Sequence, residues 1–106
     1  MKNIKVKDFS KYPGPRYIRL GDFSGEEFRD NILIPALQID NVSVDFGGVY
    51  GYGSSFLEEA FGGLVRKGVS KEKIAFLKDH LQCEDDPSIV LEVQKYLNEA
   101  LQGAKG

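Results

Sequence analysis

Apolar and charged residues alternate at the start of the chain, which is typical of a half-exposed strand. This alternation predicts a strand over residues 4–9. A turn at residues 12–15 follows, because proline removes amide donors and glycine accepts positive φ. A second short strand is then predicted over residues 16–20, paired with the first. We expect Arg16 and Arg19 to be ordinary surface residues of this strand and not an anion site.

β-branched and aromatic residues recur between positions 41 and 46, directly before the Gly47-Gly48 break. Residues of this kind fit a buried strand, so residues 41–46 are predicted to form the central strand of a sheet. A further short strand is predicted near Leu81 and Cys83.

The first helix is marked by Ser24 and Glu27, which have the spacing of a capping box. Pro35 falls late in this helix and either kinks it or ends it near Ile34. The apolar residues with helical spacing, which should face the core, are Phe28, Ile32, Leu33 and Ala36.

The clearest helix in the sequence begins near Ser54. Gly68 is predicted to cap its end, and another helix restarts at Ser70 and runs to about Lys78 or Asp79. The apolar residues of the helix from Ser54 fall on two adjacent ridges and form one broad face, made of Phe56, Leu57, Ala60, Phe61, Leu64 and Val65.

The last helix is predicted to start at Asp86-Pro87, an N-cap followed by proline at the first helical position, and residues 102–106 are expected to fray. The resulting order of elements is β-β-α-β-α-α-β-α. A chain of 106 residues suits one compact domain, residues 1–106. We therefore predict an α/β fold, a small single domain with a mixed sheet of about four strands and helices packed on one face.

Composition and charge restrict the cellular location and the class of partner that we expect. No apolar run approaches the roughly 20 residues that cross a bilayer, and the first residues alternate in charge instead of forming the apolar stretch of a signal peptide. We therefore expect a cytoplasmic protein that does not bind membranes. A net charge of −2 lacks the basic footprint of a nucleic-acid binder, so a protein or small-molecule partner is the better expectation.

The residues that could carry catalysis are few. Cys83 is the only cysteine and His80 the only histidine, so they could form a catalytic or metal pair only with a third ligand from elsewhere. Asp45 is either a metal ligand or general base, or has the structural role that we favour. We predict no catalytic residue, no metal and no cofactor, and therefore expect that the protein is not an enzyme.

The following short motifs occur in this order along the chain: Gly14-Pro15-Arg16, Ser24-Gly25-Glu26, Pro35, Val44-Asp45-Phe46-Gly47-Gly48-Val49, Ser54-Ser55-Phe56-Leu57 and Phe61-Gly62-Gly63-Leu64. In this combination the chain resembles a bacterial STAS-like family of uncharacterised function, related to the STAS domains of sulfate transporters and anti-sigma factor antagonists. The resemblance implies that Ser54 lies where an antagonist carries its phosphoacceptor serine, followed by Ser55. Two positions differ, because antagonists usually have aspartate at the position of Gly53 and glycine at that of Phe56.

Ser54 and Ser55 have three interpretations. Ser55 with Glu58 has the spacing of a second capping box, so the serines can act as helix caps. Alternatively, both serines are candidate phosphoacceptors, because a phosphate here would lie beside free amides and the positive end of a helix dipole. In the third interpretation the Gly51-x-Gly53-Ser54-Ser55 segment cradles the phosphate of a bound nucleotide, although it lacks the lysine of a P-loop.

The predicted partner-binding surface surrounds this turn and continues along the helix. Two carboxylates in its first turns, Glu58 and Glu59, would make a phosphorylated surface strongly acidic and expel a docked partner. Gly62 and Gly63 either let the helix pack closely on its own sheet or leave a flat, bare patch for a partner. The candidate partner-binding residues are Gly51, Tyr52, Gly53, Glu58, Glu59, Gly62, Gly63 and Arg66.

These observations favour a non-enzymatic regulatory module that binds a protein partner through the turn and helix starting at Ser54, with phosphorylation of Ser54 as a switch. The resemblance implies that this partner is a kinase or ATPase of the histidine-kinase fold. The alternatives are a constitutive adaptor or scaffold that uses the same helix surface, and a nucleotide-binding module.

Overall fold

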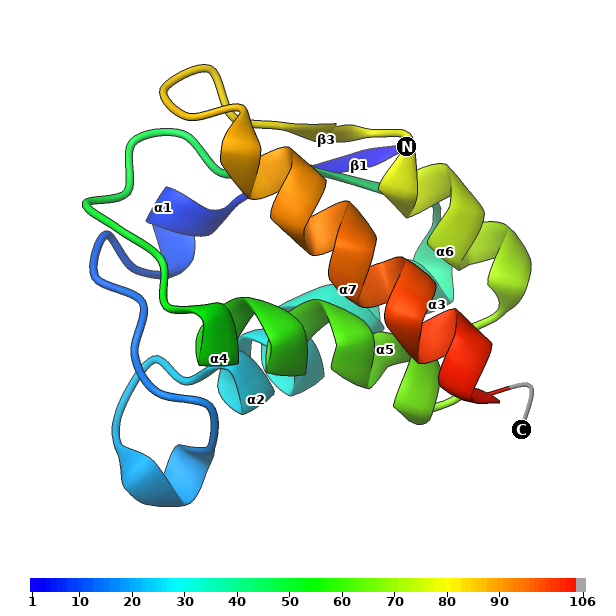
Figure 1. Ribbon diagram of the computed structural model, residues 1–106, viewed down its shortest axis with the longest axis horizontal. Coiled ribbons are helices and arrows are strands. Elements are labelled where there is room, and N and C mark those ends of the chain that lie inside the picture. Colours follow the sequence, from blue (N-terminus) through cyan, green and yellow to red (C-terminus); the bar gives the residue numbers. More distant parts are fainter. Residues whose placement is uncertain (105–106) are drawn as a thin grey trace.

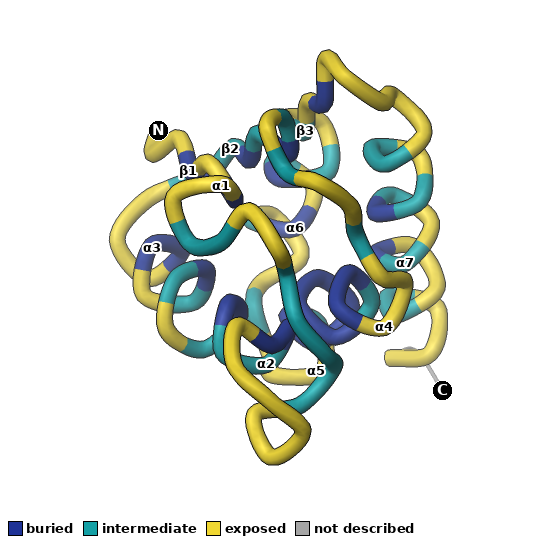
Figure 2. The backbone as a smooth tube through the Cα atoms, turned by 90° about the vertical axis from the view of Figure 1, so that its left-hand side faces the viewer, coloured by how far each residue is buried: buried dark blue, intermediate teal, exposed yellow. Residues whose placement is uncertain are grey.

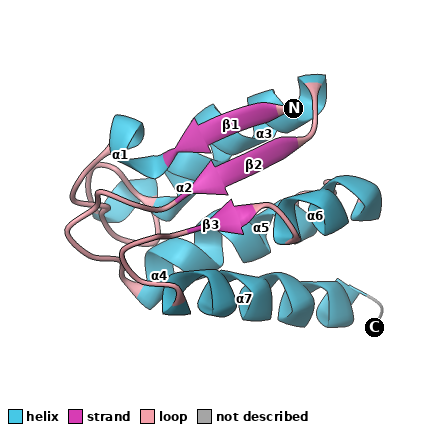
Figure 3. Cartoon of the chain, turned by 90° about the horizontal axis from the view of Figure 1, so that it is seen from above, coloured by secondary structure: helices cyan, strands magenta, loops and turns pink. Residues whose placement is uncertain are grey.

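The computed structural model describes residues 1–104 and contains a three-stranded parallel sheet. Its strands are β1 (Lys2–Lys5), β2 (Val42–Asp45) and β3 (Leu81–Gln82), in the order β1-β2-β3. Figure 1 shows the sheet edge-on at the top with the helices beneath it, and Figure 3 looks onto the other face, which no described helix covers. The predicted α/β class, the central position of β2 and the helices on one face are confirmed. The predicted mixed sheet of four strands is wrong, because three strands form it and all run parallel.

β2 alternates in burial because only one face of the sheet is covered. Val42 and Val44 are fully buried, whereas Ser43 and Asp45 alternate with them and are half-buried. On the open face Ser43 Oγ donates a hydrogen bond to Asn3 Oδ1 at 2.9 Å. Strands of parallel sheets that are covered on both faces are continuously apolar, so the polar alternation in β2 reflects the missing second layer.

The strand predicted over residues 16–20 does not form. Its place is taken by a single 3₁₀ turn, η1 (Ile18–Leu20), in an exposed loop. The carbonyl oxygens of Pro15 and Arg16 accept hydrogen bonds from Gly25 N at 2.9 Å and Glu26 N at 3.0 Å. These amides belong to the first turn of the following helix, where N–H groups lack partners within the helix. The segment therefore caps a helix instead of pairing with a strand.

β1 also ends earlier than predicted. The chain turns at Val6 into the short helix α1 (Val6–Phe9). Val6 is fully buried, and the Phe9 ring lies 5.4 Å from the ring of Phe23 and 5.1 Å from that of Phe28. Phe9 thus packs between the loop and the helical layer and not on the sheet.

The first long helical run continues past Pro35, which the sequence predicted to kink or end it. Ser24 Oγ accepts a hydrogen bond from Glu27 N at 3.0 Å, which confirms the predicted cap. Before the proline the helix widens into a π segment, in which Ile34 N donates to Arg29 O. We attribute the continuation to this wider turn, because proline has no N–H to donate and its ring crowds the preceding turn. The run consists of α2 (Gly25–Phe28), η2 (Arg29–Leu33) and α3 (Ile34–Ile39).

The second helical run begins at Ser54, as predicted, and passes through the centre of the molecule (Figure 2). It consists of α4 (Ser54–Leu57), a π segment η3 (Glu58–Gly62) and α5 (Gly63–Arg66). Gly68 has φ +88° and closes the run, so the predicted cap is confirmed. Of the predicted apolar face, Val65 is half-buried and the fully buried residues are Phe56, Leu57, Ala60, Phe61 and Leu64.

Two further helices complete the layer, α6 (Lys71–Lys78) and α7 (Ser88–Ala104). Asp86 Oδ1 accepts a hydrogen bond from Ser88 N at 3.1 Å, as expected of the predicted N-cap. Residues 102–104 of the tail that was predicted to fray are the last residues of α7. Residues 105–106 of that predicted tail lie outside the described part of the chain.

Gly25 allows α2 and α4 to approach each other closely. A Cβ atom at this position would lie 2.5 Å from the carbonyl oxygen of Phe56 and 3.2 Å from Glu59 Cβ. We expect Gly25→Ala to lower the free energy of unfolding by about 1 to 3 kcal/mol, because backbone atoms would have to move. Gly103→Ala is the matched control, since a Cβ there meets nothing within 4 Å. It should raise stability by up to about 1 kcal/mol through helix propensity. Urea unfolding of both variants tests the prediction, and equal effects would contradict it.

Candidate functional site

The serines lie in an accessible turn before α4. We call Gly51, Gly53, Ser54 and Ser55 the Ser54 turn; all four residues are exposed, and a Cβ on either glycine would meet nothing within 4 Å. The N-cap of α4 is Gly53, with φ −82° and ψ 143°, and it makes no side-chain capping bond. The capping box predicted for Ser55 and Glu58 is therefore not formed.

The Ser54 hydroxyl contacts the last helix. Ser54 Oγ donates a hydrogen bond to Glu92 Oε2 at 2.9 Å, and Tyr96 Oη donates to the same oxygen at 2.6 Å. The hydrogen bond that Tyr96 donates to Glu92 raises the pKa of Tyr96, while Ser54 acts in the opposite direction. Neither Glu92 nor Tyr96 was among the site residues predicted from the sequence. The spacing i, i+4 places Glu92 and Tyr96 on one side of α7 but says nothing of Ser54.

Tyr52, one of the predicted partner-binding residues, is half-buried and anchors the loop to the core. Its hydroxyl donates to the carbonyl oxygen of Phe46 at 2.7 Å, and its ring packs edge-on against the Phe46 ring at 5.6 Å. Burial raises the pKa of Tyr52 above its ordinary value. The loop is thus held at Tyr52, while Gly51 and Gly53 on either side remain exposed.

Two exposed tyrosines extend the surface near the Ser54 turn. Tyr12 and Tyr50 are 70% and 73% exposed, and their rings stack with centroids 4.6 Å apart and an interplanar angle of 8°. The backbone of Tyr50 is fixed by a hydrogen bond from its N–H to Lys11 O at 3.0 Å. Tyrosine is enriched at protein interfaces, so this preformed pair is a candidate contact surface. This pair is not predictable from the sequence, because nothing in the local pattern joins positions 12 and 50.

Three of the predicted partner-binding residues, Glu58, Glu59 and Arg66, belong to an ion-pair network, which we call the arginine–carboxylate cluster. Arg29 Nη1 lies 2.5 Å from Glu59 Oε2. Arg16 Nη1 bridges Glu58 Oε1 at 2.6 Å and Glu59 Oε1 at 3.1 Å, and Arg66 Nη1 lies 2.8 Å from Glu58 Oε2. With Asp30, whose Oδ1 lies 2.8 Å from Arg29 Nε, three guanidinium groups balance three carboxylates.

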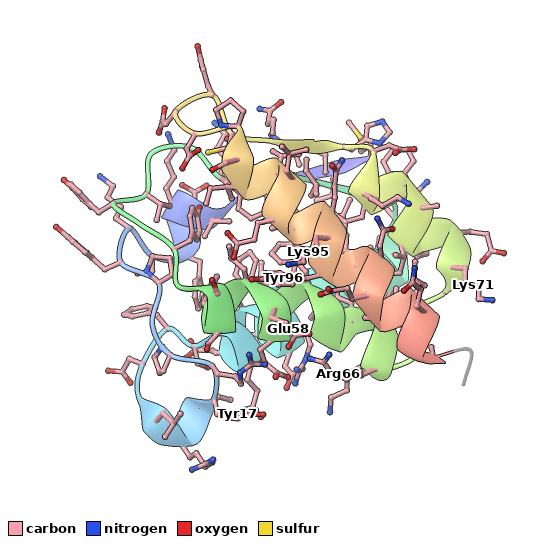
Figure 4. The ribbon with its side chains drawn as sticks, viewed as in Figure 1. Tyr17, Glu58, Arg66, Lys71, Lys95 and Tyr96 are labelled. Carbon is pink, nitrogen blue, oxygen red and sulfur yellow. The ribbon has the colours of Figure 1, made fainter. Side chains whose placement is uncertain are left out.

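The cluster stands where both helical runs are π-helical. Arg29 is the first residue of η2, and Glu58 and Glu59 are the first residues of η3. In Figure 4, Glu58 and Arg66 lie along the run that begins at Ser54, with Tyr17 of the neighbouring loop below them. Through Arg16 the cluster ties that loop to the helix. Arg16 is therefore part of a network and not the ordinary strand residue that was predicted, whereas Arg19 lies over the Tyr17 ring, 5.3 Å from its centroid.

Gly62 and Gly63 lie beneath this cluster. Both glycines are buried, and a Cβ on Gly63 would lie 2.7 Å from Arg29 Nη1. A Cβ on Gly62 would overlap the Glu58 carboxylate. The glycines are thus needed for the close approach of charged side chains. The interpretation as a bare patch is wrong, because Glu58 and Arg66 cover it.

The cluster depends on pH through Glu58. Hydrogen bonding to Arg66, opposed by burial and supported by Arg16, holds the pKa of Glu58 below its ordinary value. A folded-state pKa below the unfolded one stabilises the fold at pH values above the unfolded pKa. The contribution of Glu58 is therefore complete at neutral pH and is lost as the pH falls through the folded pKa.

Of the remaining candidates for chemistry, Asp45 and Cys83 line one cavity and His80 lies apart from them. Asp45 Oδ1 accepts a hydrogen bond from Gly47 N at 2.8 Å, the structural role favoured above. Cys83 is buried beside Asp45 in a cavity of about 460 Å³ at the carboxyl ends of the strands, and burial raises the pKa of its thiol. His80 is exposed at the other end of β3, where its ring stacks on Phe76 at 3.9 Å. Within residues 1–104, no group of histidine, cysteine or acidic residues could hold a metal ion.

These features define a small α/β domain with an accessible serine turn between its central strand and its central helix. The chain belongs to a family described as a STAS-like domain of unknown function (DUF4325), whose model matches residues 24–81, more than half of the sequence. The match spans the Ser54 turn, whereas Arg16 and Glu92 lie outside it. No curated protein and no solved structure matches the chain. Over residues 1–104, the helices are too short or too polar to cross a membrane.

Proposed function

We propose that this STAS-like domain is a non-enzymatic regulatory module that binds a protein partner at the Ser54 turn and is switched by phosphorylation of Ser54. The observation that carries the proposal is the environment of Ser54. Its hydroxyl is exposed at the first residue of a helix, directly after two open glycine positions, and is not used as a cap. A kinase can therefore reach Ser54 without unfolding the domain, and Ser55 is the second candidate acceptor.

The accessible contact surface supports protein binding. The stacked Tyr12 and Tyr50 offer aromatic area that is already ordered, so little side-chain entropy is lost when a partner docks. Glu58 and Glu59, given above as partner contacts, are engaged by the cluster and have a supporting role in this proposal. The contact residues that we retain are Gly51, Gly53, Ser54, Ser55, Tyr12 and Tyr50.

The resemblance to anti-sigma factor antagonists suggests a kinase or ATPase of the histidine-kinase fold as partner. The reaction transfers the terminal phosphoryl group of a nucleoside triphosphate to Ser54 Oγ, releases the nucleoside diphosphate and removes the hydroxyl proton. Incubation with such a kinase and ATP, followed by peptide mapping, should find one phosphate on Ser54. The Ser54→Ala protein should take up none, and a phosphate found only on Ser55 would move the acceptor by one residue.

The expected effect of the added charge is measurable once the partner is in hand. Ser54→Asp should weaken partner binding at least about tenfold, or about 1.4 kcal/mol, because charge is added at the contact surface. Ser54→Ala should bind as the wild type does. Ser70→Asp is the matched control, since it adds the same charge at a serine that caps α6, where aspartate also serves as a cap. Titration calorimetry measures all three affinities. Unchanged affinity of both Ser54→Asp and the phosphorylated protein would instead support a constitutive scaffold.

A further inference from the structure

Ser54 is joined to α7 by one shared acceptor. Glu92 Oε2 accepts hydrogen bonds from Ser54 Oγ and from Tyr96 Oη, across 38 residues of sequence in the first case and one helical turn in the second. We call these three side chains the Ser54–Glu92 latch. Figure 4 shows Tyr96 on α7 above the helical run that starts at Ser54.

The latch lies at one edge of the apolar contact that holds α7. Val93 and Leu97 are the fully buried residues of α7, and the helix packs on η3 and α5. On its opposite side α7 is tied to the end of α6, where Gln94 Nε2 donates to Lys78 O at 3.0 Å. The latch is therefore a polar contact between α7 and the first residue of α4. If the latch is lost, the apolar contact alone holds the side of α7 that faces α4.

Phosphorylation of Ser54 removes the proton on which the latch depends. The ester oxygen of phosphoserine has no hydrogen to donate, and the phosphate carries a charge of about −1.5 to −2 at neutral pH. An ionised Glu92 has only acceptor oxygens, so it cannot form a hydrogen bond with a dianionic phosphate. An attractive contact thus becomes a repulsion between like charges at contact distance.

We propose that Glu92 converts phosphorylation of Ser54 into displacement of the amino-terminal half of α7 from α4. The inference rests on the proposed phosphorylation of Ser54 and adds the way in which the modification changes the fold. Movement of α7 uncovers the side of η3 and α5 on which it packs, next to the Ser54 turn. The modified domain then differs from the unmodified one in shape as well as in charge.

The test uses the full chain with phosphoserine incorporated at position 54 during synthesis, so that no kinase is needed. Hydrogen exchange is followed by mass spectrometry in residues 88–97 of α7 and in β2. We expect exchange in residues 88–97 to be at least about tenfold faster in the phosphorylated protein and unchanged in β2. Unchanged exchange in residues 88–97 would overturn the proposal, as would equally faster exchange in β2, which would indicate general unfolding.

Two variants separate the latch from a general effect of charge. Glu92→Gln supplies an amide that can donate to the phosphate, so the phosphorylated variant should recover exchange within about twofold of the unmodified protein. Glu99→Gln removes the same charge from the exposed side of α7 and should leave exchange fast. Equal recovery in both variants would assign the effect to net charge and overturn the role of Glu92. If the exchange experiments show no role for Glu92, the proposed modification of Ser54 by a kinase and the weakened partner binding are unaffected. Failure of the kinase to modify Ser54, in turn, counts against the proposed function alone.

Discussion

Replacement of Glu59 with alanine is expected to lower the free energy of unfolding by about 3 to 5 kcal/mol. Arg29 is only 3% exposed, and its Nη1 is held by Glu59 Oε2 at 2.5 Å. Without Glu59 this guanidinium group would keep Asp30 but lose its buried partner. An uncompensated buried charge destabilises a fold far more than the pair itself stabilises it. Urea unfolding of the variant measures the loss.

Two comparisons test the physical reason for this loss. Glu58→Gln should cost at most about 1 kcal/mol, because its partner Arg66 has a 48% exposed side chain and is screened by solvent. Replacement of both members of the buried pair, Arg29→Met with Glu59→Leu, should be far less destabilising than Glu59→Ala alone. A double variant as unstable as Glu59→Ala would show that lost packing, and not the unpaired charge, causes the effect.

Phe61→Ala is expected to lower the free energy of unfolding by about 3 to 5 kcal/mol through the cavity that it leaves. Phe61 is fully buried, with its ring centroid 5.4 Å from that of Phe46 and 6.3 Å from that of Phe28. It therefore links the central strand to both helical runs. Thermal and urea unfolding should show a loss that is a large share of the total stability of so small a domain. Leu91→Ala is the control, because Leu91 is 68% exposed and should change stability by less than about 0.5 kcal/mol.

Glu59→Ala and Phe61→Ala both change the helix that presents Ser54, but neither changes the Ser54 turn itself. The core holds Phe56, Leu57 and Phe61, and the cluster holds Glu58 and Glu59, so the helix is fixed from its first turn onward. The Ser54 turn has exposed backbone and few contacts, as is common for segments that bind partners. A rigid helix thus presents an accessible serine, and partner binding can be measured separately from stability in these variants.

Patterns that depend on neighbouring residues were predicted correctly. The central strand, the start of the helix at Ser54, the Ser24 cap and the Gly68 cap all follow from residues within a few positions of one another. The apolar face from Phe56 to Leu64 follows from helical spacing, which decides which side chains can be buried together. The family was also accessible from the order of its short motifs.

Patterns that are locally ambiguous were predicted wrongly. Residues 16–20 alternate like a strand, yet the backbone at Pro15 and Arg16 is used to cap α2. Ser55 and Glu58 have the spacing of a capping box, yet Glu58 pairs with Arg16 and Arg66. In each case an interaction with residues farther along the chain replaces the predicted local structure. A short window of sequence does not contain those residues.

The sequence by itself therefore determined where the central strand and the central helix form, which of their faces is buried and where the candidate serine lies. Only the tertiary structure decided what the serine and its neighbours contact. Ser54 meets Glu92, and Arg29 meets Glu59, across 38 and 30 residues. The physical reason is that burial and capping depend on residues within one or two helical turns, whereas ion pairs and side-chain hydrogen bonds between helices depend on how the helices pack.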